Sequence, residues 1–146
     1  VGYADKDINA GAFNSKSCAL IYNTMIDQKI HKEDMPAYPL DGQFIAYSGI
    51  YYTFNFFEND KVVNQAALEA KIEMVCNKDW NELKASYPTV EAKYLSSYCA
   101  NGIYEDNLLF NTYKLQNSQL AVMNKVAGQS VEWTLGAVLY NVVKKS

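Results

Sequence analysis

The chain contains no arginine and one histidine in 146 residues, and its formal net charge is −3. Its longest basic run is Lys144–Lys145. Proteins that bind along a phosphate backbone carry clustered lysine and arginine. The composition therefore argues against a nucleic-acid-binding protein. If the ligand is phosphorylated, we expect this chain to hold the part that is not phosphate.

Residues for a catalytic or metal centre are also scarce. His31 lies in a charged run, 31–34, which is typical of a solvated surface histidine. There is no Cys-x-x-Cys pair, no Cys/His cluster, no Gly-rich phosphate loop and no Ser/His/Asp set, so neither a metal site nor a triad is predicted. Because helix neighbours point about 100° apart, we interpret the acidic pairs as solvated charge: Glu33–Asp34, Glu58 with Asp60, and Glu105–Asp106.

The sequence has no apolar run near the ~18 residues that a membrane span needs. Its first residues, Val1–Ala4, do not resemble a signal peptide and are interpreted as the middle of a longer protein. The three cysteines are Cys18, Cys76 and Cys99. In an extracytoplasmic protein, an odd count predicts a free thiol or a partner outside the chain.

Hydrophobic residues make up 49% of the chain, enough for a packed core. Their spacing predicts an α/β or α+β class with helix dominant. Ser15, Ser48 and Ser130 are expected to cap helices, and Asn101–Gly102 is expected to separate two of them. Helices are predicted over 15–30, after Ser48, over 65–77, 80–86, 90–100 and 103–113, and after Ser130; short buried strands are predicted at 44–47 and within 118–126.

Twelve residues are tyrosines, which suit half-buried walls. Tyr94 and Tyr98 are four apart, so on a helix their β-carbons lie about 5–6 Å apart. A nucleobase between two rings needs about 7 Å, which modest splay supplies. Packing of both rings on the core is the commoner outcome of this spacing. Tyr52, Asn55 and Asn59 share another helix face.

Three ordered blocks resemble the ecto-nucleoside triphosphate diphosphohydrolases, the apyrases. The run 38–53 contains Pro-Leu-Asp-Gly-Gln-Phe followed by Ala-Tyr-Ser-Gly-Ile-Tyr-Tyr, similar to a family segment. The second block, 75–80 (Val-Cys-Asn-Lys-Asp-Trp) continued by 93–99 (Lys-Tyr-Leu-Ser-Ser-Tyr-Cys), matches better. Trp133-Thr134-Leu135-Gly136 resembles the last apyrase motif. The resemblance runs from about Gly2 to the C-terminus.

The resemblance implies the helix-rich C-terminal lobe of an actin/Hsp70/RNase H-like two-lobed fold. Residues 1–130 would form the nucleobase-binding lobe, and 131–146 a helix packing toward an N-terminal lobe that this chain lacks. It places nucleobase contacts on Tyr98, Tyr94 and Tyr52, with Asn55 and Asn59 as weaker candidates for ribose or base. Trp133 and Gly136 would support the site from beneath.

Cys76 and Cys99 match a family disulfide. Cys18 matches a cysteine whose partner lies before Gly2, in the N-terminal lobe. The family's catalytic and phosphate-binding motifs are absent here, so catalysis and most contacts to a bridging Ca²⁺ or Mg²⁺ are expected elsewhere. The implied activity is phosphate release from nucleoside tri- and diphosphates by a secreted or periplasmic hydrolase, with this segment alone inactive. The alternative is a non-catalytic nucleoside-binding module.

Overall fold

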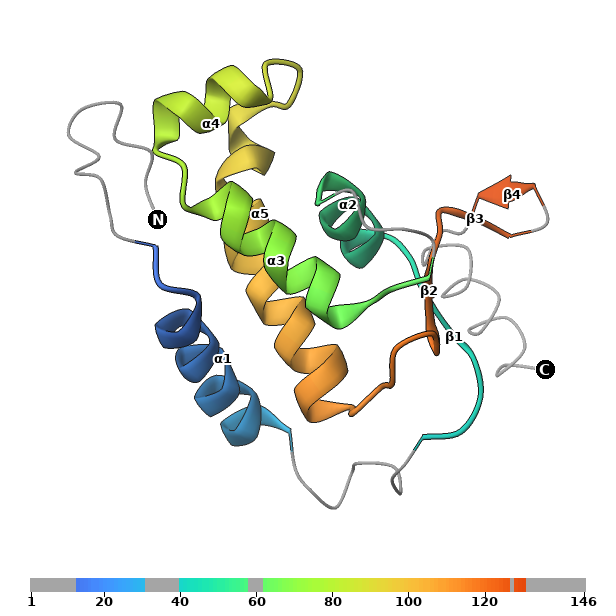
Figure 1. Ribbon diagram of the computed structural model, residues 1–146. Coiled ribbons are helices and arrows are strands. Elements are labelled where there is room, and N and C mark those ends of the chain that lie inside the picture. Colours follow the sequence, from blue (N-terminus) through green and yellow to red (C-terminus); the bar gives the residue numbers. More distant parts are fainter. Residues whose placement is uncertain (1–12, 31–39, 58–61, 127, 131–146) are drawn as a thin grey trace, which may run out of the picture.

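The computed structural model describes residues 13–30, 40–57, 62–126 and 128–130 (Figure 1). These residues form a helix-rich arrangement with two small sheets, as the composition predicts. In chain order the elements are α1 (Ser15–Lys29), β1 (Phe44–Ala46), α2 (Gly49–Phe56), α3 (Gln65–Cys76), α4 (Trp80–Ser86), α5 (Ala92–Asp106), the π-helical η2 (Asn107–Thr112), β2 (Leu120–Val122), β3 (Lys125–Val126) and β4 (Gln129–Ser130).

Helix α5 is the centre of the helical part, because α1, α2 and α3 all pack against it (Figure 1). The core lies between these helices and β2. Its side chains come from almost every element, and burial of each large apolar side chain contributes about 1.5–3 kcal/mol. The most deeply buried are Phe54, Phe57, Val63, Leu68, Val75, Leu95 and Leu120.

The predicted break at Asn101–Gly102 is wrong, because α5 runs unbroken from Ala92 to Asp106. Gly102 is not a helix end but a point of close approach between helices. A β-carbon there would lie 2.7 Å from Phe57 Cε2 and 3.2 Å from Ile72 Cδ1. Glycine in mid-helix costs about 1 kcal/mol relative to alanine, and here it admits the ring of Phe57.

Side chains cap the starts of α1, α3 and α4, whereas α2 and α5 begin without a side-chain cap bond. Asn14, rather than Ser15, caps α1, accepting a hydrogen bond from Ser17 N at 2.9 Å. Asn64 caps α3, and Asp79 caps α4 by accepting hydrogen bonds from the backbone N–H groups of Asn81 and Glu82. Ser48 occupies the cap position of α2 with φ 59° and makes no side-chain cap bond there. Each of the side-chain caps at Asn14, Asn64 and Asp79 stabilises its helix by about 1 kcal/mol.

Strands β1 and β2 pair in parallel, with Phe44 opposite Leu120 and Ala46 opposite Val122. The strand predicted within 118–126 is divided: β2 is largely buried, whereas Val126 in β3 is 43% exposed. Strand β3 pairs antiparallel with β4 across a turn in which Gly128 has φ 80°. Ser130 lies in β4, and the helix predicted after it lies outside the described residues.

Candidate functional site

Helices α2 and α5 bring Tyr52, Tyr94 and Tyr98 into one neighbourhood. Tyr52 is 60% exposed and Tyr94 50% exposed, while Tyr98 is partly buried. Burial raises the pKa of Tyr98, and the nearby phenols of Tyr94 and Tyr52 raise it further. Tyr52 and Tyr98 are 46 positions apart in the sequence, and the packing of α2 against α5 brings them near each other.

Tyr98 is held from behind by an aromatic stack. Its ring lies 4.2 Å from that of Phe56, centroid to centroid, with an interplanar angle of 11°. Phe56 in turn contacts Tyr87 at 4.7 Å and Phe57 at 5.0 Å. Because Tyr98 is still partly exposed, it presents a fixed aromatic surface at the protein's exterior.

The rings of Tyr94 and Tyr52 have different neighbours. Lys93 Nζ lies 4.6 Å from the centre of the Tyr94 ring, a cation–π arrangement. A hydrogen bond to Glu91 raises the pKa of Lys93 and keeps its ammonium charged. Tyr52 meets Tyr51 edge-on, with centroids 5.3 Å apart. Both rings keep large exposed areas, as surfaces that stack on a flat ligand require.

The other predicted site residues are not all described. Asn55 is exposed on α2, in the turn after Tyr52. Asn59, Trp133 and Gly136 lie outside the described residues, as does His31. Their assignment to the ribose, the base or the support of the site stays a prediction.

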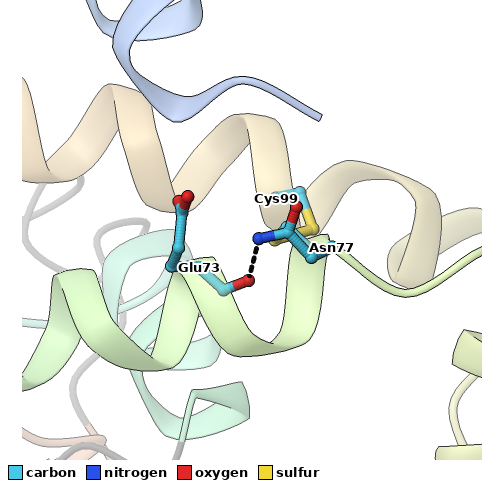
Figure 2. The surroundings of a disulfide bond; sticks show 4 residues. Glu73, Asn77 and Cys99 are labelled. Atoms are coloured by element: carbon cyan, nitrogen blue, oxygen red, sulfur yellow. Dashed lines mark hydrogen bonds between the residues drawn. A yellow bond between two sulfur atoms is a disulfide. The ribbon is translucent and has the colours of Figure 1, made fainter. Parts of the chain in front are cut away.

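A disulfide joins α3 to α5 next to the tyrosines (Figure 2). It links Cys76 to Cys99 with a Cα–Cα distance of 5.8 Å, which is the pairing that the family resemblance implied. Asn77 Nδ2 donates a hydrogen bond of 2.7 Å to the Glu73 carbonyl at the same helix end (Figure 2). Cross-linking the residue beside Tyr98 restricts how far α5 can move from α3.

Cys18 has no disulfide partner among the described residues. It is partly buried on α1, beside Tyr22, whose pKa is raised by burial and then by the thiol. The bond to an N-terminal lobe that the resemblance implies stays a prediction.

Glu105 and Asp106 are not solvated surface charge, so that interpretation is wrong. Glu105 is 8% exposed and Asp106 6% exposed. Burial raises the pKa of each carboxyl to about 7; a hydrogen bond with Thr53 opposes this for Glu105, and Glu69 adds to it for Asp106. The sequence interpretation rested on the 100° between helix neighbours, which does not say which face of the helix is buried. Extending the spacing of Leu95, Gly102 and Ile103 by one turn would have placed Asp106 inside.

A groove of about 500 Å³ lies between α1, α3 and α5. Ala19, Ala66 and Ile103 contribute to its walls, and the charged groups along it include Lys16, Glu69 and Asp106. It does not include the tyrosines. Within 13–30, 40–57, 62–126 and 128–130, no group of three His, Cys, Asp or Glu side chains is arranged to hold a metal ion.

The chain belongs to the GDA1/CD39 (nucleoside phosphatase) family, whose model matches residues 14–146. It is similar to ectonucleoside triphosphate diphosphohydrolase 1 of Rattus norvegicus, with 40% identity over 107 residues. It is also similar to ectonucleoside triphosphate diphosphohydrolase 8 of Gallus gallus, with 34% identity over 104 residues, and of Homo sapiens, with 35% over 104. Each match covers 69% of this chain and 21% of the relative. The match thus spans about a fifth of the relatives' length. No helix among the described residues has the length and apolar character of a membrane span.

Proposed function

We propose that this chain is the nucleobase-binding part of a hydrolase that releases phosphate from nucleoside tri- and diphosphates. The observation that carries the proposal is the gathering of Tyr52, Tyr94 and Tyr98 on α2 and α5 in a nucleoside phosphatase family member. The names of the similar enzymes, nucleoside triphosphate diphosphohydrolases, support this substrate class.

In this proposal the flat base stacks on the tyrosine rings, with Tyr98 as the main contact. Phe56 holds the Tyr98 ring in place, so little side-chain freedom is lost when a base binds. Base–aromatic stacking contributes about 1–3 kcal/mol per base and tolerates every base, because each has a π-face. Asn55, which is exposed on α2, would hydrogen-bond the ribose or the base edge. Broad base selectivity is the expected consequence.

In this proposal the residues that catalyse phosphate release lie in the rest of the protein. That part would form the second lobe of an actin-like fold. Ca²⁺ or Mg²⁺ would be held mainly by the phosphates of the substrate and by that lobe, where it would neutralise phosphate charge. The described residues contribute orientation: they hold the base so that the phosphates point away from this chain. Cys18 would form a disulfide with a cysteine of the other lobe. The full-length protein would act outside the cytoplasm.

The test is a kinetic comparison of full-length wild type with Tyr98→Ala, measuring phosphate release from nucleoside tri- and diphosphates with and without chelator. We expect Tyr98→Ala to raise KM roughly tenfold or more and to change kcat at saturation little, because stacking binds ground state and transition state alike. Tyr104→Ala is the matched control: it lies on the same helix, and its ring contacts Tyr22 on α1 at 5.6 Å.

An equal KM for wild type and Tyr98→Ala, or equal effects of the two tyrosine variants, would overturn the nucleobase assignment. Nucleoside binding without phosphate release in the full-length protein would instead favour the non-catalytic binding module.

A further inference from the structure

One face of α5 makes several of the contacts that hold α2 and the residue after it. Tyr98 stacks on Phe56, and four residues later Gly102 admits Phe57. Glu105, three residues further along, completes this face, since positions i, i+4 and i+7 point the same way. The contacts at Tyr98 and Gly102 involve aromatic rings and do not depend on the charge of a side chain. The contact at Glu105 is polar and lies inside the protein.

The Glu105 carboxyl meets the Thr53 hydroxyl in an almost dry environment. Thr53 Oγ1 lies 3.2 Å from Glu105 Oε1 and 3.1 Å from the Gly49 carbonyl. Thr53 is 1% exposed. Glu105 Oε2 is buried and has no hydrogen-bond partner among the described residues. This bond therefore ties the middle of α2 to the end of α5.

The geometry at Thr53 distinguishes the two protonation states of Glu105. A hydroxyl has one proton, so Thr53 can donate fully either to Gly49 or to Glu105. When Glu105 is protonated, its O–H donates to Thr53 Oγ1, and Thr53 donates to the Gly49 carbonyl. Both short contacts are then satisfied. When Glu105 is ionised, Gly49 loses its side-chain partner and a charge is left in the core with one donor.

We propose that protonated Glu105 is a positioning residue for the nucleobase site: through Thr53 it holds α2, and with it Tyr52, at the correct spacing from Tyr94 and Tyr98 on α5. This rests on the proposed function. Tyr52 directly precedes Thr53 in α2, and Phe56 follows in the next turn. A displacement of α2 at Thr53 therefore changes both the Tyr52 position and the stack behind Tyr98.

The surroundings of Glu105 allow this protonation at neutral pH. Burial raises its pKa to about 7, with the Thr53 bond as the opposing influence. On α2 its neighbour Thr53 is uncharged, and Tyr52 is an exposed phenol. On α5 itself the adjacent carboxyl is Asp106. On the side of α1 and α3, Lys16, Glu69 and Glu73 line the groove with Asp106, not with Glu105. Near neutral pH, a small change of pH therefore shifts the fraction of Glu105 that is ionised.

The test compares full-length wild type with Glu105→Gln from pH 5.5 to 8.5, measuring KM and kcat for a nucleoside triphosphate. The Gln amide donates to Thr53 at every pH, as the protonated acid does. We expect equal KM values at low pH and a wild-type KM about threefold to tenfold higher than that of the variant at high pH, the worth of one buried hydrogen bond. The ratio of the two KM values cancels the titration of the substrate phosphates.

Thr53→Val provides a second variant of nearly the same shape that lacks the hydroxyl. At low pH we expect the KM of Thr53→Val to be higher than that of wild type. The ratio of the KM of Thr53→Val to the KM of Glu105→Gln should not change with pH. If wild type and Glu105→Gln show parallel KM profiles, the positioning role is overturned. If Glu105→Gln does not fold, a wild-type to Thr53→Val KM ratio that is constant with pH overturns it equally. If Tyr98→Ala instead has the same KM as wild type, the proposed function itself is overturned, and not only the role of the Glu105–Thr53 contact.

Discussion

The ring of Tyr98 lies parallel to that of Phe56, 4.2 Å away and tilted by 11°. The two residues come from helices 42 positions apart in the sequence, α2 and α5. One face of Tyr98 is therefore covered by protein, and in the proposed function the base would stack on the other. The Phe56 ring restricts the rotamers of Tyr98 before a ligand binds. Binding to Tyr98 therefore costs less side-chain entropy than binding between two unrestrained rings.

Replacing Phe56 with Leu should weaken nucleotide binding. The substitution keeps the site apolar but removes the stack, which is worth about 0.5–1.5 kcal/mol beyond burial. We expect KM to rise roughly twofold to tenfold with kcat at saturation unchanged, measured by phosphate release. Phe110→Leu is the matched control, because Phe110 is 7% exposed in η2 and lies three turns along from Tyr98. If both variants alter KM alike, the backing role of Phe56 is refuted.

Replacing Gly102 with Ala should destabilise the protein, although alanine is the better helix former. The new β-carbon would lie 2.7 Å from Phe57 Cε2, and Phe57 is 1% exposed in the core. Overpacking of this kind costs about 1–3 kcal/mol, more than the ~1 kcal/mol gained in helix propensity. We expect a lower Tm by thermal unfolding. Asn101→Ala, at the exposed neighbouring position, should leave Tm unchanged or raise it; a Tm of Gly102→Ala above wild type would contradict the close contact.

Replacing Asp106 with Asn should change how stability depends on pH. Burial, followed by the negative charge of Glu69, raises the Asp106 pKa from 3.8 to about 7. The folded state therefore binds a proton that the unfolded state has released between these values. The stability that Asp106 contributes is fully present below about pH 4 and is lost as pH rises through 7, by on the order of 4 kcal/mol.

We expect Asp106→Asn to match wild type in Tm near pH 4 and to exceed it at pH 8, because the amide is neutral throughout. The measurement is thermal or urea unfolding across pH 4 to 8. Glu69→Gln, an exposed change on α3, should have a smaller effect of the same sign. A constant difference between Asp106→Asn and wild type over this range would show that Asp106 does not titrate as the burial predicts.

Local sequence patterns predict the helices well where nothing distant intervenes. The apolar spacing of Leu68, Ile72 and Val75 defines α3, and Asp79 with Trp80 marks the start of α4. The same spacing places Tyr94 and Tyr98 on one helical face. The disulfide between Cys76 and Cys99 was implied by family resemblance rather than by spacing, and the structure contains it.

Contacts between distant segments decided the rest. The sequence shows a glycine at 102 but not the Phe57 ring that requires it, so a helix break was predicted where the helix continues. It likewise shows two acidic residues at 105 and 106 but not the packing of α1, α2 and α3 around them. Parallel pairing of β1 with β2 joins residues more than 70 positions apart.

The amino-acid sequence by itself thus determined the family and the helical periods. Only the tertiary structure decided which face of α5 is buried, and with it the stack behind Tyr98 and the burial of Glu105. The physical reason is that periodicity fixes the relative direction of side chains within one helix. The environment on each side is supplied by elements far away in the chain, and burial, not sequence position, sets the pKa of a carboxyl.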